Sequence, residues 1–225
     1  MTLFPLQCRL GAFSFCYREK TPVAIETEVK ISIGDAPEFV RSLGRMNPVE
    51  TAPRHFEDNF LLDYPDRRMY SKRSLVRVRM TDHGSFLTFK GQPREAGKFK
   101  SREEVESRVE DGLAVLRVLK ELGLRTWFRY QKYRHEYKVS ASGIAGAVVI
   151  VAVDETPIGN FVEFEGTEAG IQEIAAAMGF SEADYLRDSY YALYSQSCNE
   201  RGVPAEDMVF PPGSQCGPGG CGREF

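Results

Sequence analysis

The chain has 225 residues, 42% of them hydrophobic, which is enough to bury one sizeable core. Its 29 Lys and Arg residues and 32 Asp and Glu residues give a formal net charge of −3. This balance argues against a general nucleic-acid-binding protein, because such proteins are usually basic overall. No apolar run approaches the roughly 20 residues that a membrane-spanning helix needs. We therefore expect neither nucleic acid nor a membrane as a partner.

The two ends of the chain lack the apolar periodicity of the middle. Pro5 and Arg9 interrupt residues 1–22, which predicts a poorly ordered leader and not a secretory signal. Residues 198–225 are rich in Gly and Pro, and we expect them to be disordered. The five cysteines are an odd number and lie mostly in these ends, which indicates a reduced, cytoplasmic protein. Cys216 and Cys221 have no nearby histidine and make a poor zinc site.

Residues 23–197 are expected to form one domain of eight strands and four helices. The strands are predicted at 23–33, 56–63, 74–80, 85–91, 99–109, 127–139, 145–154 and 161–166. The helices are predicted to begin at the caps Asp35, Asp111, Thr167 and Ser181, and to end near Gly44, Leu122, Gly179 and Gln196.

The strands repeat one pattern, with charged side chains on one face and apolar side chains on the other. Glu26, Glu28 and Lys30 share a face because alternate residues of a strand point the same way. Eight antiparallel strands can close into a barrel, and the helices offer apolar stripes to cover its outside. We therefore expect an α+β fold, a closed eight-stranded antiparallel β-barrel whose charged face lines a wet tunnel. The alternative is an open sheet whose charged face meets solvent.

The charged face contains two chemical sets. Arginine forks and lysine charges suit phosphate oxygens, and the cations on this face are Lys30, Arg77, Arg79, Lys90, Arg102, Lys132 and Arg134. Clustered carboxylates suit Mg²⁺ or Mn²⁺, and the anions are Glu26, Glu28, Glu104, Glu106, Asp154, Glu163 and Glu165. Together the two sets would bind a polyphosphate as its metal complex.

The ordered motifs resemble the CYTH superfamily, also called triphosphate tunnel metalloenzymes. The motif Glu-x-Glu-x-Lys at 26–30 is similar to the signature of this family. Further matches follow in the family's order, and the resemblance extends to about residue 197. These matches are Asn59 and Asp63, Leu75-Val76-Arg77-Val78-Arg79, Leu87-Thr88-Phe89-Lys90-Gly91, Arg102-Glu103-Glu104-Val105-Glu106, Lys132-Tyr133-Arg134, Asp154, Gly159-Asn160-Phe161-Val162-Glu163-Phe164-Glu165 and Ser189-Tyr190-Tyr191.

The resemblance implies a tunnel that binds a triphosphate together with a divalent metal ion, Mg²⁺ or Mn²⁺. It implies that the metal is held by Glu26, Glu28, Glu163 and Glu165. Glu104, Glu106 and Asp154 would help to hold the metal or orient water, so the expected catalytic carboxylates are Glu26, Glu28, Glu104, Glu106 and Asp154. The phosphates would be held by Lys30, Arg77, Arg79, Lys90, Lys132 and Arg134, with Arg102 matching the pattern less closely.

Three functions remain open at this point. The first is metal-dependent hydrolysis of inorganic triphosphate, thiamine triphosphate or a nucleoside triphosphate. The second is a class IV adenylyl cyclase, which forms cyclic AMP and pyrophosphate from ATP. The third is a polyphosphate- or nucleotide-binding module without turnover. The three histidines are assigned no role in the site, and both a monomer and a homodimer remain open.

Overall fold

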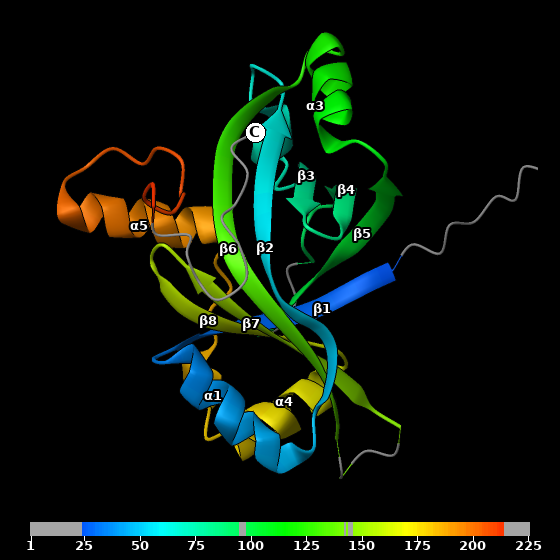
Figure 1. The fold of residues 1–225 in the computed structure, drawn as a ribbon, viewed down its shortest axis with the longest axis vertical. Helices are drawn as coiled ribbons and strands as arrows, with labels where there is room; N and C mark the ends of the chain where they lie inside the picture. The colour runs from blue at the N-terminus through cyan, green and yellow to red at the C-terminus, as the bar shows by residue number, and fades with distance from the viewer. Residues whose placement is uncertain (1–23, 95–97, 142, 144–145, 214–225) are drawn as a thin grey trace, which may run out of the picture.

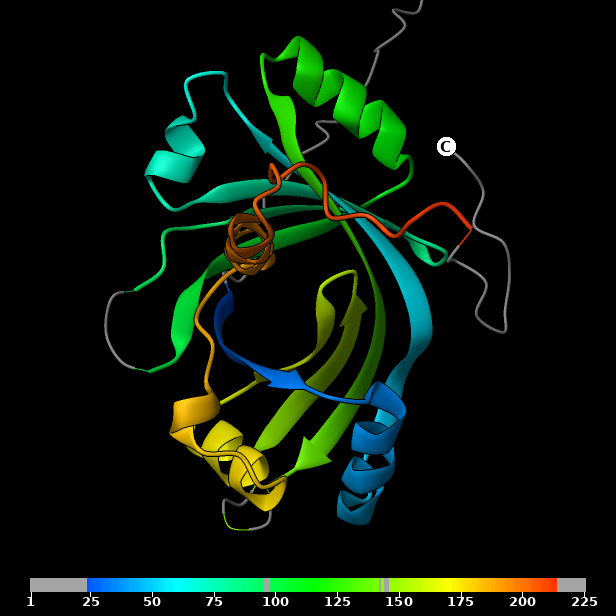
Figure 2. The same cartoon turned by 90° about the vertical axis from the view of Figure 1, so that its left-hand side faces the viewer.

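A closed barrel of antiparallel strands forms the centre of this computed structural model, which describes residues 24–94, 98–141, 143 and 146–213. The strand order is β1-β5-β4-β3-β2-β6-β7-β8, and β8 pairs again with β1 (Figure 2). The strands are β1 (Ala24–Ile33), β2 (Val49–Asp63), β3 (Leu75–Thr81), β4 (Gly84–Lys90), β5 (Lys100–Val109), β6 (Arg125–Ser140), β7 (Val148–Thr156) and β8 (Gly159–Glu165). The predicted closed barrel is confirmed, and the alternative of an open sheet is wrong.

The helices begin where polar side chains can cap them. They are α1 (Ala36–Leu43), α2 (Arg68–Ser71), α3 (Gly112–Glu121), α4 (Glu168–Ala177) and α5 (Tyr190–Arg201). The carboxylate of Asp35 accepts the amide N–H of Glu38 at 2.7 Å, and Asp111 accepts that of Ala114 at 3.0 Å. Each bond satisfies a backbone donor that a helix start leaves unpaired. The caps predicted for α1, α3 and α4 are therefore confirmed.

The apolar strand face lies outside the barrel and forms the main core with two helices. Figure 1 shows α1 and α4 together beside β7 and β8. Phe39 and Leu43 of α1 and Ile171 and Ile174 of α4 are buried in one cluster with strand residues such as Val151. The helix α3 covers another part of the outer wall, near β2 and β3. Because the outside is apolar, the charged face of each strand points into the barrel.

The predicted helix from Ser181 to Gln196 is wrong. Ser181 does form a capping box with Asp184, but it opens only the short 3-10 turn Glu182–Asp184. The chain then becomes extended, and Leu186 pairs with Lys30 of β1 through backbone bonds of 2.8 and 3.4 Å. A second cap, Ser189, begins α5. Strand pairing with the barrel therefore overrides the local helix signal in this segment.

The strand β2 also begins earlier than residue 56, the predicted start. It begins at Val49 and pairs along most of its length with β6, with register shifts between Ala52 and His55. Pro53 lies within this irregular part and has no N–H to donate to a ladder. The proline and the polar residues around it hide the first half of the strand from a pattern search.

The segment after residue 198 differs from the expected disorder as far as Gly213. The helix α5 continues to Arg201 and ends at Gly202, whose φ of 67° lies in the left-handed region. Met208 is fully buried and exchanges backbone hydrogen bonds with Arg129 and Gln131 of β6, at 2.9 Å each. The expected leader at 1–22, the end of the tail at 214–225 and four of the cysteines lie outside the described residues. Within the described ranges, every helix is too short or too polar to cross a bilayer.

Candidate functional site

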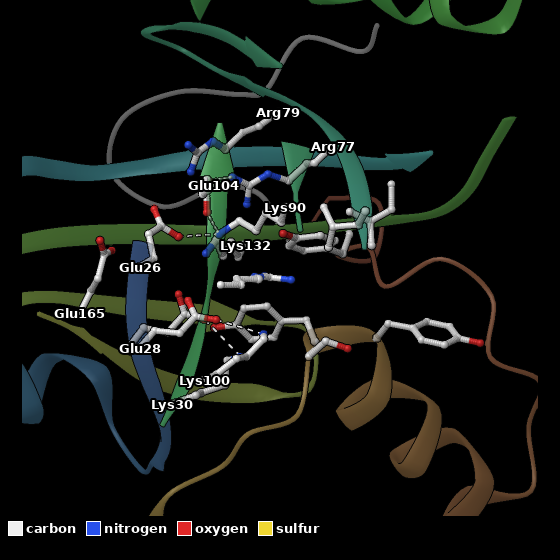
Figure 3. A pocket seen from close by; sticks show the side chains of 18 of the residues that line it. Glu26, Glu28, Lys30, Arg77, Arg79, Lys90, Lys100, Glu104, Lys132 and Glu165 are labelled. Atoms are coloured by element: carbon white, nitrogen blue, oxygen red, sulfur yellow. Dashed lines mark hydrogen bonds and ion pairs between the residues drawn. The ribbon is translucent and has the colours of Figure 1, made fainter. Parts of the chain in front are cut away.

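A cavity of about 200 Å³ lies inside the barrel (Figure 3). Its wall comes from seven of the eight strands and from the start of α5. The basic lining residues are Lys30, Arg77, Arg79, Lys90, Lys100, Arg102, Lys132 and Arg134. The acidic lining residues are Glu26, Glu28, Glu104, Glu106, Glu136, Glu163 and Glu165. The cavity therefore brings together every predicted site residue except Asp154.

Strand register explains why these side chains meet. Glu28 lies opposite Glu165, and Lys30 lies opposite Glu163, across the pair β1 and β8. The residue between them, Val29, is buried on the outer face. Alternation in each strand therefore turns the charged set inward, and closure of the barrel brings the separate sets within reach of one another.

Most of the carboxylates are paired with a cation. The ammonium of Lys100 lies 3.0 Å from Glu28, and that of Lys30 lies 3.2 Å from Glu163, which Arg134 also contacts. Lys90 forms ion pairs with Glu26, at 3.1 Å, and with Glu104. Glu165 forms no ion pair with any residue that the structure describes. The four carboxylates expected to hold metal thus differ in how fully they are neutralised.

The pKa values follow this division. Burial raises the pKa of Glu26 to about 8, with a contribution from hydrogen bonding to Glu104 that Lys90 only partly offsets. Burial and the nearby carboxylates also raise the pKa of Glu165. Burial alone would raise the pKa of Glu28, but Lys100 and other lysines lower it to about 2. Lys30 and Arg134 likewise outweigh burial and hold the pKa of Glu163 well below its usual value. Glu26 therefore retains a proton near neutral pH that a bound cation would displace, and the pKa of Glu165 is shifted in the same direction.

Asp154 lies behind the cavity wall. It is fully buried and accepts Lys132 at 2.9 Å, Arg134 at 2.7 and 2.6 Å, and the Tyr190 hydroxyl at 2.6 Å. These donors use its oxygens, so it fixes two of the cations that line the cavity. This position differs from the expected role in holding metal or orienting water.

Several residues of the site were missed from the sequence. Glu57 is 1% exposed and binds Arg79 at 3.1 Å and Lys132 at 3.5 Å. Its alternation with Asn59 in β2 was the signal that could have found it. The ring of Tyr190 lies 4.1 Å from the ammonium of Lys30, a cation–π contact that no strand pattern indicates. Lys100 and Glu136 also line the cavity, and strand parity places them on the charged face.

The arginines have unused donors. The Nε atoms of Arg77, Arg79 and Arg102 are buried and have no hydrogen-bond partner among the described residues. A buried donor without a partner costs about 1–3 kcal/mol, which an anionic ligand can recover. Arg77 already reaches Thr88 and Glu106, at 3.3 Å each. This part of the wall is suited to phosphate oxygens.

The acidic residues fit a metal ion that is shared with a ligand. Among the residues that the structure describes, no three His, Cys, Asp or Glu side chains are close enough to hold a metal by themselves. Mg²⁺ commonly binds one or two carboxylates, substrate phosphates and water. Glu26 and Glu165, whose raised pKa values reflect incomplete neutralisation by nearby cations, provide carboxylates of that kind.

Comparisons with known proteins agree with this architecture. A protein of Methanocaldococcus jannaschii, named as a candidate adenylate cyclase, is 26% identical over 174 residues, which cover 75% of this chain and 98% of that protein. The structure of a candidate adenylate cyclase from Vibrio parahaemolyticus has a TM-score of 0.64 at 16% identity and covers 77% of this chain and 99% of that one. A Hippeastrum protein, described as a candidate adenylyl cyclase with a dominant triphosphatase activity, has a TM-score of 0.56 at 17% identity, covering 77% and 95%.

The family assignment rests on most of the chain. The family model of the CYTH domain matches residues 24–190, from the start of β1 to the first residue of α5. This span includes every strand of the barrel and every charged residue that lines the cavity. The chain therefore belongs to the CYTH domain family.

Proposed function

We propose that the chain is a divalent-metal-dependent hydrolase of a triphosphate-containing substrate. The observation that carries the proposal is the cavity wall, where eight Lys and Arg side chains share the space with Glu26 and Glu165, two carboxylates whose pKa values are raised. The basic set can neutralise a phosphate chain, and the two carboxylates can meet the cation that accompanies it. A protein that only binds anions has little need of so many enclosed carboxylates.

The chain's own residues account for binding and proton transfer. Arg77 and Arg79 would bind phosphate oxygens through their unpaired Nε atoms, and Asp154 holds Lys132 and Arg134 in place to do the same. Glu26 changes its protonation near neutral pH, so its carboxylate can accept a proton from the attacking water. Mg²⁺ or Mn²⁺, when bound, would neutralise charge on the phosphoryl oxygens.

The cyclase is the second candidate, favoured by the name of the Methanocaldococcus relative. Cyclisation requires a pocket for the base and a fixed ribose as well as the triphosphate site. The cavity of about 200 Å³ is smaller than the range of about 300–1,000 Å³ that is usual for drug-sized ligands. Its size supports a reaction in which only the triphosphate enters the tunnel, and hence hydrolysis.

A substrate panel tests the proposal. The purified chain is incubated with inorganic triphosphate, thiamine triphosphate and ATP, each with Mg²⁺ or Mn²⁺, and orthophosphate, pyrophosphate and cyclic AMP are measured. We expect orthophosphate from at least one substrate and little cyclic AMP from ATP. The Arg77→Ala variant should raise KM by roughly 10- to 150-fold, since it removes a charge-assisted phosphate contact. Cyclic AMP and pyrophosphate as the main products would establish the cyclase. Tight binding without turnover would indicate a binding module.

A further inference from the structure

His55 lies at the irregular part of β2 and faces into the barrel beside Glu57. Its side chain is only 10% exposed. The ring atom Nδ1 lies 2.9 Å from the carbonyl oxygen of Pro53, and Nε2 lies 3.5 Å from the carboxylate of Glu57. The register between β2 and β6 shifts between Ala52 and His55, and irregularities of this kind re-aim side chains.

These two contacts make the ring sensitive to its own protonation. A carbonyl oxygen only accepts hydrogen bonds, so the neutral ring can donate across the shorter, 2.9 Å contact only in the tautomer with its proton on Nδ1. Nε2 then presents a lone pair to a carboxylate, which is also an acceptor. A second proton on Nε2 turns this repulsion into an ion pair. Burial alone would lower the pKa of His55, but hydrogen bonding to Glu57 and to the Pro53 carbonyl raises it above its ordinary value.

Glu57 connects His55 to the phosphate-facing cations. It is 1% exposed and does not line the cavity, but it lies 3.1 Å from Arg79 and 3.5 Å from Lys132, and both of these do. When His55 is charged, it forms an ion pair with Glu57 and compensates part of the negative charge of that carboxylate. Arg79 and Lys132 then keep more of their positive charge for a ligand. When His55 is neutral, the two cations compensate Glu57 without its help.

Other charged groups also face His55. Arg134 is its cross-strand neighbour on β6, and Glu136 on the same strand favours the charged ring. His83, in the turn between β3 and β4, lies 5.7 Å away between ring centroids. Arg134 already forms ion pairs with Asp154 and Glu163, so Glu57 remains the principal partner of the His55 ring.

We propose that His55 is a positioning residue: its protonation, acting through Glu57, strengthens the hold of Arg79 and Lys132 on a triphosphate. The inference rests on the proposed function, because it assigns the tunnel a triphosphate ligand. It predicts that binding weakens as pH rises through the neutral range, with little change in kcat.

The first test follows KM for the triphosphate that is turned over, in wild type, His55→Gln and His55→Lys. We compare KM at about pH 6 and about pH 8.5. The increase in the wild-type KM should exceed that of either variant by roughly fivefold to tenfold, because coupling between two sites is usually of this size. His55→Gln should stay near the high-pH wild-type value, and His55→Lys near the low-pH value, because lysine keeps its charge. The control is His135→Gln, since His135 contacts Glu50 and Tyr137 outside the tunnel.

A second readout does not require turnover. The imidazole resonances are titrated by NMR with and without inorganic triphosphate, and assigned with His83→Gln and His135→Gln; the chain has three histidines. We expect triphosphate to raise the pKa of His55, because linkage is reciprocal. An unmoved His55 pKa, or equal pH dependence of KM in wild type and His55→Gln, would overturn the inference. If no triphosphate is hydrolysed while the His55 pKa still rises, the hydrolase proposal fails and the role of His55 stands.

Discussion

At the scale of single residues, the carboxylates of the tunnel differ in how completely they are neutralised. Glu163 is held by Lys30 and Arg134, whereas Glu165 has no ion pair among the described residues. A carboxylate already neutralised by cations has less charge to offer a metal. The two residues are two positions apart on β8, so their side chains lie on the same face of the strand. We nevertheless expect their roles to differ.

Exchanging each carboxylate for its amide tests this difference. Glu165→Gln should raise the Mg²⁺ concentration for half-maximal activation by roughly tenfold or more. It removes a carboxylate ligand, and a contact with a charged group contributes about 1.5–3 kcal/mol to binding. Glu163→Gln should mainly lower thermal stability, because it leaves Lys30 without its ion-pair partner and removes one of the carboxylates that hold Arg134. Metal titrations and thermal unfolding of both variants give the comparison. Equal metal requirements in the two variants and wild type would contradict the assignment.

Glu26 predicts a pH dependence of stability. Its pKa is raised by burial from 4.5 to about 8, so the folded protein binds this proton more tightly than the unfolded chain does. Stability must then fall as pH rises from the unfolded value towards the folded value. We expect Glu26→Gln, without added metal, to unfold at a higher temperature than wild type near pH 8 and at a similar temperature near pH 4.5. Thermal unfolding curves at the two pH values test this prediction. The control is Asp66→Asn, which changes an exposed carboxylate.

Strand parity predicted which face each residue occupies, but not how deep it lies. Glu26, Lys90 and Arg134 were placed correctly in the cavity because strand alternation puts each of them on the charged face. Asp154 has the right parity and yet lies behind the wall, since depth depends on which side chains from other strands cover it. His55 was missed because the first half of β2 was not recognised as a strand. Glu57 lies within the predicted strand 56–63, but it was not counted in the charged set.

At the scale of elements, the C-terminal segment is the clearest case in which local pattern is insufficient. Met208 anchors it by filling a cluster with Tyr190, Tyr130 and Phe128, and Asp207 and Phe210 add hydrogen bonds to β6. One buried side chain leaves no period in the sequence. Since Tyr190 also donates to Asp154, this segment supports the wall of the site.

Removing this support should destabilise the barrel. Met208→Ala is expected to cost about 2–5 kcal/mol, the usual range for truncating a buried methionine. Deleting residues 203–225 should lower stability at least as much, because it also removes the backbone bonds to Arg129 and Gln131. Urea unfolding measures both, and the matched control is Val203→Ala, whose side chain is 45% exposed. A truncated protein as stable as wild type would show that the segment contributes nothing to the fold.

At the scale of the whole molecule, the charge of the chain and the charge of its cavity differ in sign. The chain has a formal net charge of −3. The cavity wall has eight Lys and Arg residues and seven Glu residues, and Glu26 retains its proton near neutral pH. The wall of the cavity thus carries more cations than ionised carboxylates. Overall composition cannot reveal this, because closure and register decide which charges are enclosed.

Such a cavity should be stabilised by a polyanion even before any reaction. Inorganic triphosphate at about 100 times its dissociation constant should stabilise the fold by about 2.7 kcal/mol, which for a chain of this size raises Tm by roughly 5–10 °C. The shift should occur without metal, decline with added salt, and be much smaller with orthophosphate, which meets fewer cations. Arg77→Ala should reduce it at the same triphosphate concentration, whereas Arg68→Ala, on the surface in α2, should not. Thermal unfolding with each anion tests this directly, and an equal shift in Arg77→Ala and wild type would show that triphosphate binds elsewhere.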